Sequence, residues 1–123
     1  MINWKKVRFF RQHEFDSPDK PGSGKIINEE LVVKLDLMRM FYKNPIHINS
    51  GVRTEKENKR VKGSDDSAHL KGYAVDIPTH DSRSRYKLLT LAYIVGFRRM
   101  GVYKNHLHID NDPIKPQEVI WYK

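Results

Sequence analysis

The sequence contains no cysteine among its 123 residues. This absence excludes a disulfide framework, a zinc site built from thiolates and a catalytic cysteine nucleophile. Any metal bound by the chain must therefore be held by histidine and carboxylate side chains. The sequence also lacks any stretch near the roughly 20 apolar residues that a membrane-spanning helix needs, so no insertion into a membrane is expected.

The amino-terminal residues 1–11 include no apolar stretch of signal-peptide length, which predicts synthesis in the cytoplasm without a signal peptide. Acidic residues are in deficit: Lys and Arg total 23, Asp and Glu total 15, and the formal net charge is +8. Such an excess favours a polyanionic partner without identifying it. The length predicts a single domain over residues 1–123, which we expect to be a monomer.

Hydrophobic periodicity predicts two helices, one capped by Asn28 and running to about Lys43, the other over residues 82–95. Residues 52–66 are mostly polar and are predicted to be mainly loop. Strands are predicted over residues 46–49, 73–77, 102–110 and 119–122. This order of elements indicates an α+β fold with a small antiparallel β-sheet flanked by helices.

The residues most able to carry chemistry are His69, Asp76, His106 and His108. Side chains alternate along the predicted strand 102–110, so His106 and His108 share one face while the aliphatic residues beside them point to the core. His69 precedes a glycine turn and Asp76 lies on the strand that follows, so these two side chains can converge on one point.

Two histidines and one carboxylate from this group form a three-ligand zinc set with a fourth position open for water. An open position is typical of catalytic zinc, which makes a water molecule reactive near neutral pH. On spacing alone, ordinary surface histidines that bind no metal remain the alternative.

Three ordered motifs resemble a known group of enzymes. Residues 67–76 match SxHxxGxAxD, the signature of the zinc D-Ala-D-Ala carboxypeptidases and the related phage L-alanyl-D-glutamate endolysins. Residues 49–53 resemble the upstream SGYR segment of that family, with Val52 replacing the usual aromatic residue. Residues 106–108 resemble the HxH element shared with the lysostaphin and sonic hedgehog groups of the wider superfamily. The resemblance extends from Phe15 to about residue 110.

The resemblance implies a hedgehog-like, DD-peptidase-like fold and a role for each matching residue. It implies that His69, Asp76 and His108 are the ligands of a Zn²⁺ ion. It further implies that Ser67 lines the substrate pocket and that Arg53 binds the substrate and steadies its carbonyl as charge develops, a task that suits a planar guanidinium.

The sequence departs from the family at one catalytic position. The carboxypeptidases place Glu or Asp three residues before the last zinc histidine as the general base, and this chain has Asn105 there. His106 is the nearest titratable substitute and is the predicted catalytic residue. Asp110 and Asp112 are further candidates, either as the base or as residues that orient a zinc histidine.

These motifs predict a zinc metallopeptidase that hydrolyses a peptide bond in peptidoglycan by means of a zinc-activated water. The resemblance to phage endolysins implies action on the cell wall after release by a phage lysis system. The alternative, favoured by Asn105, is a non-catalytic, hedgehog-like zinc-binding module that binds the cell wall or a protein partner. Nucleic-acid binding is not expected, because the basic segment Arg53–Lys62 has neither a docking element nor stacking aromatic residues.

Overall fold

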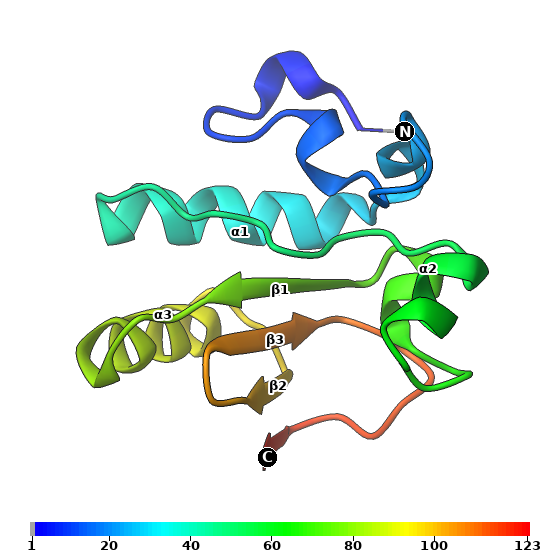
Figure 1. Cartoon of the computed structure of the whole chain (residues 1–123). Coiled ribbons are helices and arrows are strands. Elements are labelled where there is room, and N and C mark those ends of the chain that lie inside the picture. The colour runs from blue at the N-terminus through cyan, green and yellow to red at the C-terminus, as the bar shows by residue number, and fades with distance from the viewer. Residues whose placement is uncertain (1) are drawn as a thin grey trace.

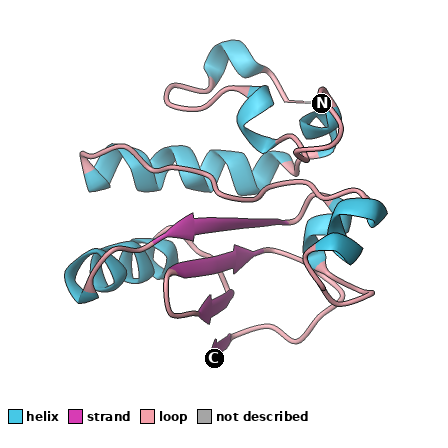
Figure 2. Ribbon diagram, viewed as in Figure 1, coloured by secondary structure: helices cyan, strands magenta, loops and turns pink. Residues whose placement is uncertain are grey.

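The computed structural model describes residues 2–123 as helices packed on a four-stranded sheet (Figures 1 and 2). Short 3-10 helices occur in the amino-terminal segment and before the first strand. The α-helices are α1 (Glu29–Tyr42), α2 (Glu55–Arg60) and α3 (Ser82–Ile94), and the strands are β1 (Ala74–Pro78), β2 (Arg99–Val102), β3 (His106–Asp110) and β4 (Val119–Tyr122).

The sheet has the strand order β1-β3-β2-β4. Strand β3 runs antiparallel to both of its neighbours, whereas β4 pairs with β2 in parallel. The predicted α+β class is confirmed, with one parallel pair added to an otherwise antiparallel sheet. The pairing sets Asp76 of β1 directly opposite His108 of β3, so two of the predicted metal ligands lie side by side.

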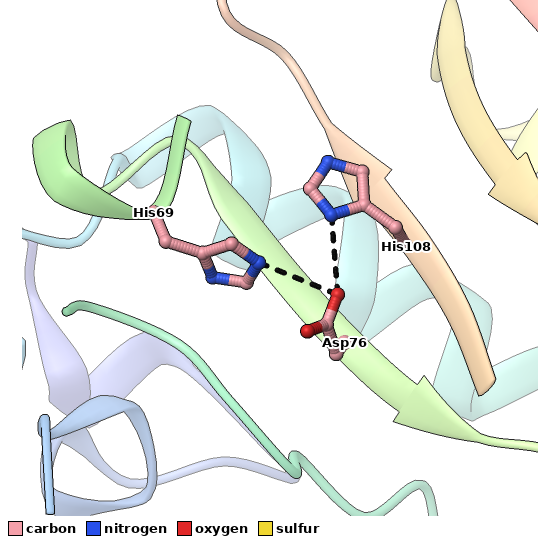
Figure 3. A group of neighbouring side chains, drawn as sticks. All are labelled: His69, Asp76 and His108. Atoms are coloured by element: carbon pink, nitrogen blue, oxygen red, sulfur yellow. Dashed lines mark hydrogen bonds and ion pairs between the residues drawn. The ribbon is translucent and has the colours of Figure 1, made fainter. Parts of the chain in front are cut away.

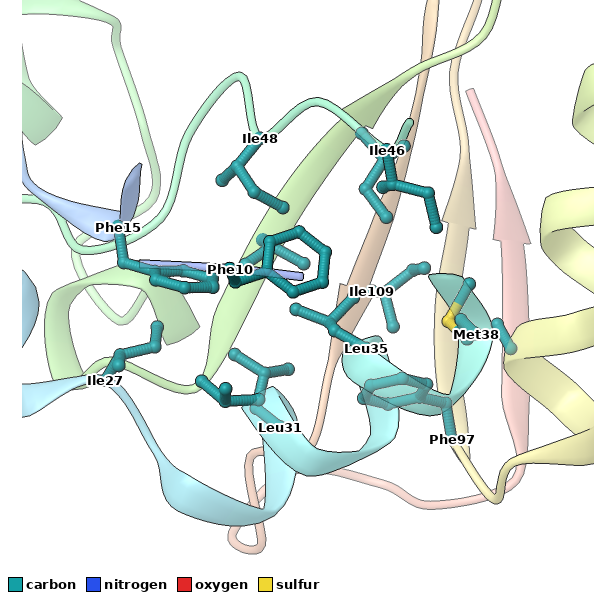
Figure 4. Packing of buried hydrophobic residues seen from close by; sticks show 14 of the residues in the cluster. Phe10, Phe15, Ile27, Leu31, Leu35, Met38, Ile46, Ile48, Phe97 and Ile109 are labelled. Carbon is teal, nitrogen blue, oxygen red and sulfur yellow. The ribbon is translucent and has the colours of Figure 1, made fainter. Parts of the chain in front are cut away.

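Helix α1 begins where the sequence predicts, because the side chain of Asn28 accepts a hydrogen bond from the backbone N–H of Leu31 at 3.0 Å. It ends at Tyr42, and Lys43 follows in the left-handed conformation. The helix packs against α3, and α3 contacts β3, so the two helices enclose one core with the sheet (Figure 4). Leu107 and Ile109 of β3 are fully buried in this core, which leaves the histidines of β3 on the opposite face.

Two strand predictions are wrong. Residues 46–49 form no strand, although the N–H of Asn49 bonds to the carbonyl oxygen of Asp76 at 2.9 Å and an isolated bridge pairs Ser50 with Asp76. The predicted strand 102–110 is two strands, because the chain reverses between β2 and β3 and the N–H of Tyr103 bonds to the carbonyl oxygen of His106 at 3.0 Å. This reversal brings Tyr103 next to the histidines of β3.

Within residues 2–123, none of the helices is both long and apolar enough to cross a membrane.

Packing in the core yields a test with a matched control on the same helix. Leu35 is 0% exposed and Leu37 is 41% exposed. We expect Leu35→Ala to lower the free energy of unfolding by about 3 kcal/mol, because it removes apolar contacts and leaves a cavity. Leu37→Ala should lower it by less than about 1 kcal/mol. Urea unfolding followed by circular dichroism measures both, and equal losses would contradict this placement of the core.

Candidate metal centre and active-site cleft

His69 lies in a short 3-10 helix, Ala68–Lys71, that ends directly before β1. Ser67 caps this helix, since its Oγ accepts a hydrogen bond from the backbone N–H of His69 at 3.3 Å. Gly72 follows with φ of 76°, and a Cβ at this position would lie 2.5 Å from the carbonyl oxygen of Ile26. Glycine is therefore required at this turn, as the sequence predicts, and the turn fixes His69 beside the sheet.

His69, Asp76 and His108 point toward one another from three separate segments (Figure 3). The Oδ1 atom of Asp76 lies 3.3 Å from Nε2 of His69 and 3.1 Å from Nδ1 of His108. One possible ligand atom from each of the three residues lies within 4.8 Å of the other two. The structure thus brings together the three residues that the sequence predicts as metal ligands.

Hydrogen bonds on the outer side of each ring determine which nitrogen presents a lone pair. Nδ1 of His69 lies 2.7 Å from the carbonyl oxygen of Gly51, and Nε2 of His108 lies 2.7 Å from Oδ2 of Asp110. Since these oxygens only accept, the nitrogens facing them carry the proton in the neutral rings. Nε2 of His69 and Nδ1 of His108 then each direct a lone pair toward Asp76.

The donor set fits a zinc ion. Nε2 of His69 is buried without a hydrogen-bond partner, and the carboxylate that it faces cannot donate to it. Two imidazole lone pairs and a carboxylate oxygen that converge in this way match a three-ligand zinc site. The bonds from the rings to Gly51 and Asp110 are the kind of outer contact that orients zinc-binding histidines.

The cluster pairs an ionised carboxylate, which attracts a cation, with a histidine on which a proton competes with a metal ion. Burial raises the pKa of the Asp76 carboxyl, but the adjacent His108 and His69 rings, which can donate to Asp76 when they are protonated, outweigh burial and leave this pKa well below its usual range. Burial lowers the pKa of His108, yet its bonds to Asp110 and Asp76 raise it on balance. A metal ion that binds here must displace the proton held between these groups, because only the neutral imidazole coordinates.

Asp110 holds His108 in place. It is 1% exposed, its Oδ2 faces His108, and its Oδ1 accepts from Nε of Arg99 at 2.6 Å. Because both oxygens are engaged, Asp110 is suited to orienting His108 and poorly placed to take a proton from substrate or water. Asp112 supports a turn instead, since its Oδ1 accepts from the backbone N–H of Ile114 at 3.1 Å.

The guanidinium of Arg53 contacts the cluster of His69, Asp76 and His108 at the second carboxylate oxygen of Asp76. Its Nη2 lies 3.3 Å from Oδ2 of Asp76, and its Nη1 donates to Oδ1 of Asn58 at 3.2 Å. Its Nε donates to Oγ of Ser50 at 3.3 Å. Asn58, which is 3% exposed, is a site residue that the sequence did not predict.

Asn58 comes from α2, and the prediction that residues 52–66 are mainly loop is wrong at this point. The helix has six charged or polar residues, so hydrophobic periodicity cannot detect it. Oγ1 of Thr54 accepts from the backbone N–H of Glu57 at 3.1 Å. Threonine followed three residues later by glutamate is the pattern of a helix start, and this signal identifies α2 in the sequence.

His106 lies beside the cluster and contacts it less closely. Its Nε2 is 4.0 Å from Oδ1 of Asp76, and its ring stacks on Tyr103 at a centroid distance of 4.5 Å. Burial lowers the pKa of His106, and the charge of Asp76 offsets only part of this effect. The ring is therefore neutral at neutral pH and can accept a proton. Asn105 lies in the exposed turn between β2 and β3, and its backbone carbonyl accepts from the N–H of Thr79.

A cleft of about 380 Å³ is lined by the three candidate ligands together with Arg53 and His106. Ser67 lies on its wall, and a role of Ser67 in substrate binding stays a prediction. The lining also includes three lysines and two aromatic residues: Lys62, Lys115, Lys123, Tyr103 and Trp121. The cleft thus joins a candidate metal centre to a cationic wall.

Comparison with known protein families gives a match. The family described as Peptidase M15 matches residues 9–110. The matched range includes the three candidate ligands and Arg53, and it ends with the last residue of β3, before β4. No curated protein matches the chain.

Proposed function

The chain belongs to the peptidase M15 family, since the family match covers well over half of its length, and we propose that it is a zinc metallopeptidase hydrolysing a peptide bond in peptidoglycan. The convergence of His69, Asp76 and His108, with a buried Nε2 atom that has no hydrogen-bond partner, carries this proposal. Three protein ligands leave a coordination position for water, as in catalytic zinc sites.

The chemistry divides among the residues of the cleft. His69, Asp76 and His108 would hold a zinc ion, which would supply a Lewis acid for the scissile carbonyl and for a water molecule near neutral pH. Arg53 has five N–H donors, and its contacts to Ser50, Asn58 and Asp76 leave donors free for the carbonyl oxygen as negative charge develops. His106 accepts the proton of the attacking water and transfers it to the leaving amine.

The charge of the molecule supports an anionic polymer as substrate. Lys62, Lys115 and Lys123 line the cleft, and the whole chain carries a formal net charge of +8. Positive potential at the cleft raises the local concentration of peptides that carry carboxylates, such as those of the cell wall. Synthesis in the cytoplasm, release by a phage lysis system and action on the wall form part of the same proposal.

Digestion of purified peptidoglycan tests the function. We expect the protein to release new amino groups and peptides that have gained one water, and we expect a zinc chelator to abolish both and added zinc to restore them. Mass spectrometry of the products assigns the bond. Free D-alanine identifies a carboxypeptidase, and cleavage within the stem or cross-bridge identifies an endolysin-type endopeptidase. His69→Ala is the matched inactive control.

The alternative is a non-catalytic module that binds zinc together with the cell wall or a protein partner, and Asn105 favours it because an amide cannot act as a general base. The same experiment separates the two proposals. A protein that retains zinc but releases no amines from walls of any cross-link type would contradict the peptidase and support the module.

A further inference from the structure

The carboxyl-terminal strand β4 places an aromatic residue against the catalytic cleft. Trp121 lies on β4, outside the matched residues 9–110, and lines the cleft. Its ring centre is 5.4 Å from that of His108. The indole lies on the backbone of β2 at Gly101, where a Cβ would lie 2.4 Å from Nε1 of the indole. Only glycine leaves room for the indole at this position.

From this position Trp121 holds Tyr103. The indole Nε1–H donates to the hydroxyl of Tyr103 at 3.1 Å, and the direction is fixed because an indole N–H only donates. The ring of Tyr103 in turn stacks on His106, with the two planes inclined by 7°. The contacts between Trp121, Tyr103 and His106 thus connect β4 to the imidazole of His106.

His106 depends on this stack for its orientation. Its side chain is 33% exposed, and within residues 2–123 its ring nitrogens make no hydrogen bond. The distance of 4.0 Å from its Nε2 to Oδ1 of Asp76 is too long for a hydrogen bond that would fix the ring. The face-to-face contact with Tyr103 is therefore the contact that holds the imidazole beside the metal ligands.

We infer that Trp121 is a positioning residue for His106 and that β4 belongs to the catalytic apparatus. The inference rests on the proposed function, in which His106 moves the proton. Trp121 acts indirectly. Its hydrogen bond fixes the Tyr103 ring, and this ring fixes the angle at which His106 faces the reacting water. A misdirected base lowers the rate of the chemical step and leaves substrate binding nearly unchanged.

Two conservative variants and their combination test the inference in the zinc-loaded protein. Trp121→Phe removes the N–H donor, and Tyr103→Phe removes its acceptor while keeping the stacked ring. We expect each to lower kcat about fivefold, the loss that follows from one hydrogen bond, with KM changed less than about twofold. The double variant should be no slower than the slower single variant, because both changes break the same contact. Tyr122→Phe, at a tyrosine on β4 that is 86% exposed, should leave kcat unchanged.

A second route from Trp121 to the metal ligands needs its own control. The guanidinium of Arg99 lies 5.1 Å from the Trp121 ring and also bonds to Asp110, which orients His108. An effect carried by this route would lower zinc affinity, whereas the route through Tyr103 leaves zinc affinity unchanged. Tyr103→Phe leaves the contact between Trp121 and Arg99 intact, so its zinc affinity should equal that of the wild type.

A readout that needs no turnover is exchange of the indole N–H with solvent, followed by NMR. Tyr103→Phe should speed exchange at Trp121 about tenfold and leave Trp4 unchanged as an internal reference. If the wild type is active, any of three results would overturn the positioning role alone. These are additive losses of kcat in the double variant, reduced zinc affinity in Tyr103→Phe, and unchanged exchange at Trp121 in Tyr103→Phe. A wild type no more active than His69→Ala would overturn the proposed function as well.

Discussion

Replacing His69 with alanine is expected to lower peptide hydrolysis by at least about a thousandfold and to remove bound zinc, since loss of a metal that stabilises charge removes several kcal/mol of transition-state stabilisation. The side chain is 1% exposed, and its Nδ1 is already engaged by Gly51, so its Nε2 is directed at Asp76. Arg53, which also contacts Asp76, cannot replace it, because a guanidinium has no lone pair to offer a metal ion.

His47 and His80 provide the matched controls for this prediction. Both are exposed, and neither lines the cleft. His47→Ala and His80→Ala should keep the zinc content and the rate of the wild type. Atomic emission measures zinc per chain, amine release measures the rate, and thermal unfolding of the chelated proteins shows whether His69→Ala still folds. A folded His69→Ala variant that retains zinc and activity would contradict the assignment of the site.

The sequence predicts the convergence of His69, Asp76 and the β3 histidines because local rules fix the direction of these side chains, whereas the choice of His108 as a ligand rests on the family resemblance. Alternation along a strand predicts the shared face of His106 and His108, and the glycine after His69 predicts the turn that returns the chain to the sheet. These rules act over a few residues, so they can be applied without knowing which distant segments contact the site. The structure agrees with them and adds the bonds to Gly51 and Asp110, which depend on distant segments.

Contacts between distant segments account for what the sequence did not predict. Helix α2 has no hydrophobic periodicity, so the sequence does not predict the position of Asn58. The start of the helix at Thr54 nevertheless has a recognisable signal. The turn between β2 and β3 has no glycine or proline, so Asn105 is its main turn signal, and strand-forming residues on both sides obscure this signal. The parallel pairing of β4 with β2 depends on a crossover, and only this pairing brings Trp121 to the cleft.

The second large effect is expected at His106, where His106→Gln should lower kcat by about a hundredfold to a thousandfold, within the usual contribution of a general base. Glutamine keeps a planar polar group beside Tyr103 but cannot take up a proton at neutral pH. Zinc content should not change, because His106 is not among the three convergent ligands.

The other candidate bases are poorly suited to take up the proton, so a test of His106 decides which residue is the general base. Asp110 has both oxygens engaged by His108 and Arg99, and Asn105 has an amide in an exposed turn. If His106 carries the proton, His106→Gln is slow while His80→Gln, at an exposed histidine outside the cleft, has the rate of the wild type. Single-turnover hydrolysis of a synthetic stem peptide measures the chemical step directly. A zinc-loaded His106→Gln variant with an unchanged rate would remove His106 from the mechanism while leaving the metal centre intact.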